Sequence, residues 1–206
     1  MTPPSASVPR PAIFLDRDGT LNREVDYLRR VEDLVLLPGV PAALLALQAA
    51  GYELVVVTNQ SGVARGLLDE ETLAHIHDRL TELLARNGVA LLDVLWCPHH
   101  PDHPERAPHG ACSCRKPAPG MLLEAAARHR LDLARSWTVG DADRDAAAGL
   151  AAGTRAALVA TGKTPGARSR ELDGATVPVL ADLQAFAAHV LATRSEDRSG
   201  PSGQEA

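Results

Sequence analysis

The feature that most constrains the fold of this chain is a repeated alternation of short apolar runs with longer segments of helical periodicity. The apolar runs contain few polar residues and end at glycine, proline or polar turns, which is typical of strands buried on both faces of a parallel sheet. The predicted strands are Ala12–Asp16, Glu53–Thr58, Leu91–Trp96, Trp137–Gly140 and Ala156–Val159.

Helix signals occupy the intervals between these strands. An Ala- and Leu-rich segment stops at Gly51, and Asp69 can cap a helix whose apolar residues fall on one face. We therefore expect an α/β fold, a Rossmann-like three-layer sandwich with a mostly parallel central sheet. The predicted helices cover Pro38–Ala50, the segment from Asp69 to Asn87-Gly88, a segment opened by Pro119, and Asp143–Ala152.

Length and composition suggest one domain over residues 11–192, with disordered tails at residues 1–10 and 193–206. No apolar run approaches the roughly 20 residues that span a bilayer, and the start of the chain lacks a secretory pattern, so we expect a cytoplasmic protein. A net charge of -5 and an aromatic share of 3% argue against a nucleic-acid partner. We expect a monomer that contacts neither nucleic acid nor membrane.

The first polar motif is FLDRDGTLN, which begins at Phe14. Asp16 ends a predicted strand and Asp18 lies two residues further, so both carboxylates can face the same side of an extended chain. Two carboxylates in one place favour a hard cation such as magnesium. Alone, the motif could equally be a solvated turn after a core strand.

Three further motifs follow other predicted strands or precede predicted helices. Thr58 and Asn59 begin TNQSG and can donate hydrogen bonds to phosphate oxygens. Arg115 and Lys116 form a basic pair beside a helix start. Asp141 follows a strand and could complete a metal shell, and Asp145, one helical turn later, could orient Lys116. A polar turn, a surface basic pair and an acidic first helical turn are the ordinary alternatives for each motif taken singly.

The four motifs together resemble the haloacid dehalogenase superfamily of phosphotransferases over roughly residues 12–160. The resemblance implies that Asp16 attacks phosphorus to form an aspartyl phosphate and that Asp18 is the general acid and base. It implies that Thr58 and Lys116 hold the phosphoryl oxygens, and that Asp145 supports Lys116. Mg²⁺ would be held by Asp16, by the backbone carbonyl of Asp18 and by Asp141.

A second metal site is predicted within residues 97–114. Cys97, Cys112 and Cys114 lie there with several histidines, and three thiolates with one imidazole favour a tetrahedral, structural zinc site. Free thiols in a His-rich loop are the alternative, because the one-residue spacings are tighter than those of usual zinc fingers. The resemblance selects His99 as the fourth ligand over His100, His103 and His109.

The chain has no room for a large cap domain, and the loop from Arg23 to Arg30, including Tyr27, would replace one. Within the superfamily it most resembles heptose bisphosphate phosphatases and the related histidinol-phosphate phosphatases. The resemblance implies a phosphorylated sugar substrate, D-glycero-D-manno-heptose 1,7-bisphosphate cleaved at its 7-phosphate, bound by Asn59, Arg65 and Arg115. Histidinol phosphate is the alternative, and the preferred anomer stays open. Less favoured classes are a DNA 3′-phosphatase and a non-catalytic binding module stabilised by zinc.

Two smaller predictions concern residues outside the motifs. His75, His77 and His129 lie on predicted helices, where we expect them to be solvated. Met121 and Leu122 are predicted to belong to the core.

Overall fold

The computed structural model of the protein describes residues 8–103, 112–163, 169–172 and 174–198. A seven-stranded sheet runs through its centre in the order β3-β2-β1-β4-β5-β7-β6. Neighbouring strands run parallel except for β6, which pairs antiparallel with β7 at one edge. The strands are β1 (Ala12–Leu15), β2 (Glu53–Asn59), β3 (Asp93–Cys97), β4 (Trp137–Gly140), β5 (Arg155–Val159), β6 (Ser169–Leu172) and β7 (Ala175–Leu180).

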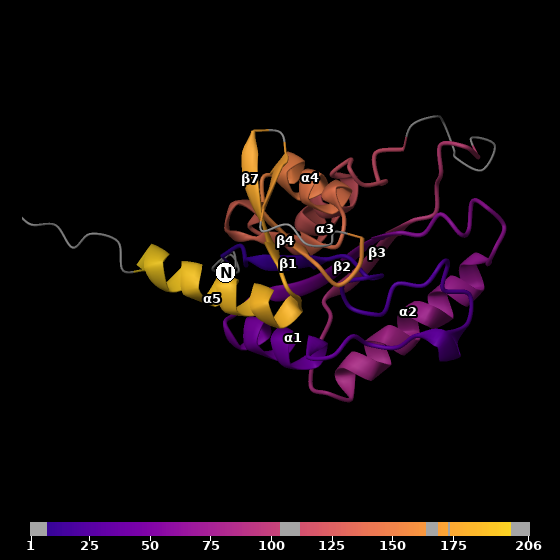
Figure 1. The fold of residues 1–206 in the computed structure, drawn as a ribbon, viewed down its shortest axis with the longest axis horizontal. Helices are drawn as coiled ribbons and strands as arrows, with labels where there is room; N and C mark the ends of the chain where they lie inside the picture. The colour runs from indigo at the N-terminus through magenta and orange to yellow at the C-terminus, as the bar shows by residue number, and fades with distance from the viewer. Residues whose placement is uncertain (1–7, 104–111, 164–168, 173, 199–206) are drawn as a thin grey trace, which may run out of the picture.

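Helices cover both faces of the sheet (Figure 1). On one face α1 packs against α5, and α2 contributes apolar side chains to the same core, whereas α3 and α4 lie together on the other face. None of the described helices is both long and apolar enough to cross a membrane. The helices are α1 (Val40–Ala49), α2 (Glu70–Ala85), α3 (Gly120–His129), α4 (Asp143–Ala152) and α5 (Leu183–Arg198), with short 3-10 turns at Val31–Asp33 and Leu133–Arg135.

The central strands are buried on both faces, which explains their continuous apolar sequences. In β1, Ile13 and Leu15 belong to the core beneath α1, α2 and α5, and the alternate residues Ala12 and Phe14 belong to the core beneath α3. Met121 and Leu122 are buried in this second core, which confirms their prediction.

The end of the chain differs from the sequence-based expectation. β6, β7 and α5 were not predicted, and α5 continues to Arg198, so the boundary of the disordered tail at residue 193 is wrong. The helix persists because it has a docking surface. Arg194 bonds to the carbonyl of Ala50 and lies over the ring of Tyr52, 5.4 Å from the ring centre. The predicted tails at residues 1–7 and 199–206 lie outside the described residues.

The strand order places β1 between β2 and β4, where the connections turn in opposite directions across the sheet. In open α/β sheets, this switch point leaves a crevice beyond the carboxyl ends of the strands. β1 ends just before Asp16, β4 ends just before Asp141, and Thr58 lies near the end of β2. The fold therefore brings three of the predicted motifs to one edge of the sheet.

Candidate active site

A cavity of about 150 Å³ opens at this edge of the sheet. Its walls come from the loop after β1, the end of β2, and single residues from more distant segments. Of the predicted site residues, those that line it are Asp16, Asp18, Thr58, Asn59 and Arg115.

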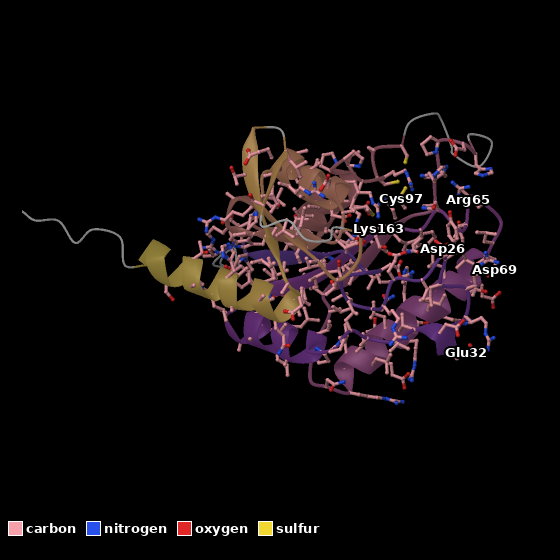
Figure 2. All side chains as sticks on the ribbon, viewed as in Figure 1. Asp26, Glu32, Arg65, Asp69, Cys97 and Lys163 are labelled. Carbon is pink, nitrogen blue, oxygen red and sulfur yellow. The ribbon has the colours of Figure 1, made fainter. Side chains whose placement is uncertain are left out.

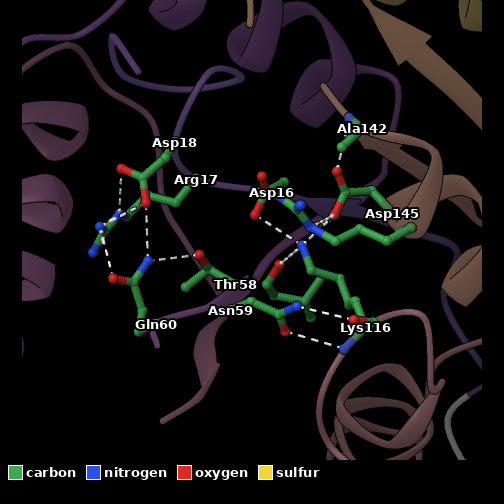
Figure 3. Close-up of polar contacts among 11 residues, drawn as sticks. Asp16, Arg17, Asp18, Thr58, Asn59, Gln60, Lys116, Ala142 and Asp145 are labelled. Carbon is green, nitrogen blue, oxygen red and sulfur yellow. Dashed lines mark hydrogen bonds and ion pairs between the residues drawn. The ribbon is translucent and has the colours of Figure 1, made fainter. Parts of the chain in front are cut away.

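A buried ionic cluster lies at the base of the site (Figure 3). The ammonium group of Lys116 donates to Asp16 Oδ1 at 2.8 Å and to the carbonyl of Val57 at 2.7 Å, and it lies 2.7 Å from Asp145 Oδ1. All three charged side chains are almost fully buried. The predicted pairing of Lys116 with Asp145 is thus present in the structure.

This cluster holds more negative than positive charge. Carboxylate oxygens of Asp16, Asp141 and Asp145 lie within 4.8 Å of one another. Burial raises the pKa of Asp141 to about 7, with the charge of Asp16 adding to the effect. Burial also raises the pKa of Asp16, although Lys116 opposes the shift. Crowded, buried carboxylates of this kind are the donor set that Mg²⁺ prefers, so these residues fit the predicted metal.

Two glycines leave space for the Asp141 carboxylate. A Cβ on Gly19 would lie 2.6 Å from Asp141 Oδ2, and a Cβ on Gly162 would lie 2.1 Å from the same atom. Gly19 also has a φ of +78°, which favours glycine. The glycine of the DGT sequence, Gly19, therefore allows both the turn after Asp18 and the close approach of the Asp141 carboxylate to the backbone.

The carboxylate of Asp18 is enclosed by donors (Figure 3). Arg17 donates to it from Nε at 3.2 Å and from Nη2 at 2.7 Å, Asn22 donates at 2.9 Å, and Gln60 donates at 2.9 Å. Burial alone would raise the pKa of Asp18, but the charge and hydrogen bonds of Arg17, with those of Asn22 and Gln60, lower it overall. In this conformation Asp18 is held as a carboxylate.

Arg17 and His77 are functional candidates that sequence reasoning did not identify. The Arg17 side chain is fully buried, and its Nη1 lies 3.1 Å from His77 Nε2 on α2. Burial, with the nearby charge of Arg17, lowers the pKa of His77 to about 3, so the neutral ring accepts from Arg17. The expectation that His77 is solvated is wrong, because α2 turns it inward toward a buried guanidinium. His129 is also engaged, 2.7 Å from Asp93, whereas His75 is exposed.

The second motif provides two differently placed side chains. Thr58 is buried, and its hydroxyl accepts from Gln60 at 2.9 Å. Asn59 forms two bonds of 3.0 Å with the backbone of Lys116, one as donor and one as acceptor. Asn59 was predicted to bind substrate. These two bonds also fix the backbone of the loop that carries Lys116.

Two cations at the cavity were not predicted. Arg144, on the first turn of α4, and Lys163, after β5, line it together with Arg115. The Nε atom of Arg144 is buried and has no hydrogen-bond partner among the described residues. Lys163 lies 3.5 Å from Glu24 and donates its backbone N–H to Asp141 at 2.8 Å. Neither residue belongs to a short motif, and only the fold brings them to the site.

Arg65 does not line the cavity wall as described. It lies instead between two loops, with Nη2 3.1 Å from His100 Nε2 and its guanidinium 6.0 Å from the ring centre of Tyr27. The direct contact of Arg65 with substrate stays a prediction.

The three cysteines and His99 meet beyond the end of β3. Cys97 Sγ lies 3.6 Å from His99 Nδ1, 3.6 Å from Cys112 Sγ and 3.0 Å from Cys114 Sγ, and Cys114 lies 3.4 Å from His99 Nδ1. A tetrahedral zinc site with ordinary bond lengths separates its ligands by about 3.5–3.8 Å. The four residues fit that metal, and the thiols are free. His109 lies outside the described residues.

Comparison with known proteins identifies related chains. A family model described as HAD-hydrolase-like matches residues 113–186. A D-glycero-beta-D-manno-heptose-1,7-bisphosphate 7-phosphatase of Photorhabdus laumondii is 42% identical over 175 residues, which cover 84% of this chain and 93% of the relative. The enzyme of the same name from Escherichia coli K12 is 43% identical over 155 residues, 74% of this chain and 81% of the relative.

Solved structures agree with these relatives. A D,D-heptose 1,7-bisphosphate phosphatase from B. bronchiseptica, complexed with magnesium and phosphate, has a TM-score of 0.76 and 37% identity, over 89% of this chain and 99% of that chain. A HAD-like phosphatase from Mesorhizobium loti has a TM-score of 0.80 and 36% identity, over 93% and 89% of the two chains. The chain therefore belongs to the haloacid dehalogenase-like phosphatases, in the family of these heptose bisphosphate phosphatases.

Proposed function

We propose that this phosphatase removes the 7-phosphate of D-glycero-β-D-manno-heptose 1,7-bisphosphate through an aspartyl-phosphate intermediate on Asp16. The observation that carries the proposal is the placement of Asp16 and Asp18 on one small cavity, with Lys116 and Asp145 buried directly behind Asp16. The relatives from Photorhabdus laumondii and Escherichia coli K12 are both named for the β anomer, which supports this substrate and this anomer.

In the first step a carboxylate oxygen of Asp16 attacks phosphorus, and the bond from phosphorus to the sugar oxygen breaks. Asp18 gives a proton to the leaving sugar oxygen. Because four donors favour the carboxylate form of Asp18 in the resting site, it must turn away from at least one of them to carry that proton. In the second step Asp18 takes a proton from water, which attacks the aspartyl phosphate and releases inorganic phosphate.

The buried cluster supports both steps electrostatically. Thr58 and Lys116 are placed to hold the phosphoryl oxygens, on which the charge of the transition state resides. Asp145 keeps Lys116 charged and directed at Asp16. Mg²⁺ held by Asp16, Asp141 and the backbone carbonyl of Asp18 would screen the repulsion between carboxylate and phosphate.

The charges around the cavity favour a substrate with a second anionic group. Arg115, Arg144 and Lys163 line it. Lys163 Nζ lies 3.5 Å from Glu24, and Arg144 Nε lies 4.0 Å from Asp145 Oδ1. That Nε atom makes no hydrogen bond among the described residues, so Arg144 retains a donor for substrate. A bisphosphate has a distal phosphate to satisfy these donors, whereas histidinol phosphate has a cationic amine at its other end.

We also propose that Cys97, His99, Cys112 and Cys114 hold a structural zinc ion. Four protein ligands leave no open position for substrate. Arg115 and Lys116 follow Cys114 directly, and Arg115 donates to the carbonyl of His99 at 2.8 Å, so an ordered loop fixes the start of the lysine motif. We propose a cytoplasmic monomer, which fits the net charge of -5.

The test is phosphate release with Mg²⁺ from both anomers of heptose 1,7-bisphosphate and from histidinol phosphate. We expect a marked preference for the β anomer, and a loss of at least about 10⁴-fold in kcat with Asp16→Asn, since a carboxamide is a poor nucleophile. Preference for histidinol phosphate would overturn the substrate and keep the chemistry. Full activity of Asp16→Asn would overturn the chemistry.

A further inference from the structure

We propose that Arg65 is a positioning residue that fastens Tyr27, on the wall of the cavity, to the loop that carries Cys97 and His99. We call Tyr27, Arg65, His100 and Asp102 the brace. It links the loop after β1, which carries Tyr27, to the loop after β3, which carries His100 and Asp102. The proposal depends on the proposed function only in taking the cavity as the substrate site.

Arg65 lies in the loop between β2 and α2 (Figure 2). It is within reach of His100 on one side and Tyr27 on the other. Its Nη2 lies 3.1 Å from His100 Nε2 and 3.7 Å from Asp102 Oδ2. Its guanidinium carbon lies 6.0 Å from the ring centre of Tyr27, which is at the outer limit for a cation–π contact. Only a third of the Arg65 side chain is exposed, so these partners rather than solvent surround it.

The His100 ring links Arg65 to Asp102. Its Nε2 faces Arg65 Nη2, and its Nδ1 lies 3.2 Å from the backbone nitrogen of Asp102 and 3.4 Å from Asp102 Oδ2. Arg65, His100 and Asp102 therefore form a continuous chain of polar contacts.

This chain is anchored to the cysteine cluster. His100 directly follows His99, whose Nδ1 lies 3.6 Å from Cys97 Sγ. A second link runs beside it, because the backbone N–H of Ala64 donates to the carbonyl of Pro98 at 3.2 Å. Arg65 thus contacts the loop directly after the predicted zinc ligand His99.

The other end of the brace holds a residue whose backbone requires support. Tyr27 has a φ of +56°, in the left-handed region that a residue with a side chain rarely adopts. Its ring lines the cavity, and a Cβ on Gly62 would come within 3.3 Å of Tyr27 Cδ1, so the ring also lies close to the backbone after β2. Tyr27 is 37% exposed, and Arg65 is the cation that lies over its ring.

A double-mutant cycle separates this role from direct binding of substrate. We expect Arg65→Gln to raise KM about fivefold and to change kcat by less than about twofold, because the wall moves and the reacting groups do not. Tyr27→Ala should raise KM as well, and adding Arg65→Gln to it should produce little further change. If the two effects multiply, Arg65 acts on substrate directly and the proposal is wrong.

Hydrogen exchange measured by mass spectrometry tests the brace without any substrate. In Arg65→Gln, amides of residues 24–30 should exchange faster, those of β2 should be unchanged, and the metal content should stay that of the wild type. Arg79→Gln is the matched control, because that side chain is equally exposed, at 33% against 32%, and pairs only with Glu82 on its own helix. Unchanged exchange at residues 24–30 would overturn the proposal even if no phosphate ester were hydrolysed.

Discussion

The two groups of residues that we propose to surround metal ions are built in different ways. The catalytic group draws Asp16, Lys116, Asp141 and Asp145 from distant parts of the sequence, and each follows a buried strand or lies near a helix start. The cysteine group comes from two close pairs, Cys97 with His99 and Cys112 with Cys114, and only Cys97 belongs to a regular element. The first group is positioned by the sheet, whereas the second lies in loops.

The two groups also differ in charge and packing. Lys116 balances part of the charge of the catalytic carboxylates, which are almost fully buried. The cysteine group brings three thiols together, of which Cys97 is buried in an apolar cluster and Cys112 and Cys114 only pack against it. We therefore expect the proposed zinc ion to contribute directly to folding, and the proposed Mg²⁺ to contribute mainly to catalysis.

The largest effect should come from breaking the catalytic group with Lys116→Met. We expect kcat to fall at least about 10³-fold, because a buried donor to the phosphoryl group is lost. We also expect the metal-free protein to lose about 3–5 kcal/mol of unfolding free energy, since Asp16 and Asp145 are left without their buried partner. Phosphate release and urea unfolding measure the two quantities.

A second variant separates the two consequences. Lys116→Met combined with Asp145→Asn removes one of the two uncompensated carboxylates, so it should recover part of the stability and none of the activity. If Lys116→Met alone were as stable as the wild type without metal, the catalytic group would not depend on charge balance, and the contrast with the cysteine group would disappear.

Cys112→Ser should have a smaller effect, confined to the other group. We expect the zinc content to fall below one ion per chain and Tm to drop by about 5–10 °C, because a structural metal contributes to folding. The drop in kcat should be at most about tenfold, since Asp16 and Lys116 keep their own supports. Ser113→Ala, at the exposed residue next to it, is the control and should change neither property. A metal content unaffected by Cys112→Ser would contradict the assignment.

Much of this organisation could be predicted from the sequence because its signals are local. Every predicted strand is present, displaced by one or two residues at most at its ends, since buried parallel strands have continuous apolar sequences. β6 escaped prediction because it is a short edge strand with partly exposed side chains, and β7 beside it because most of its side chains are partly exposed and Pro178 interrupts its pattern. α5 was not predicted, and the domain was ended at residue 192, because the last turns of this helix have a polar composition and the contact of Arg194 with Tyr52 is visible only in the fold.

The site divides in the same way. Asp16, Thr58, Lys116 and Asp141 stand in short motifs that could be recognised, but Arg144 and Lys163 reach the cavity through tertiary structure alone. Arg17 lay inside the first motif and was passed over, because nothing local indicates that its guanidinium is buried against Asp18. Arg65 was recognised, but its contacts with His100 and Tyr27 could not be foreseen, because a motif gives the order of residues and not the direction of a side chain.

The smallest predicted effect concerns His77, the buried partner of Arg17, which in turn pairs with Asp18 beside the catalytic group. Its pKa is lowered from 6.5 to about 3, mainly by burial and then by Arg17, while Asp18 acts in the opposite direction. Between these two pH values His77 is protonated in the unfolded chain and neutral in the folded protein. Its contribution to the unfolding free energy therefore becomes more unfavourable as pH decreases from about 6.5 toward 3. His77→Gln keeps an acceptor for Arg17 and removes the titration. Between pH 7 and pH 4.5 the wild type should lose roughly 2–3 kcal/mol more unfolding free energy than the variant.

Urea unfolding at several pH values measures this difference, and His75→Gln, an exposed residue two positions away, is the control that should follow the wild type. Parallel curves for the wild type and His77→Gln would mean that the folded protein admits a proton at His77, and that Arg17 gains no fixed acceptor there. The expected divergence would instead show that the network behind Asp18 is a fixed electrostatic support of the catalytic group, formed without any metal.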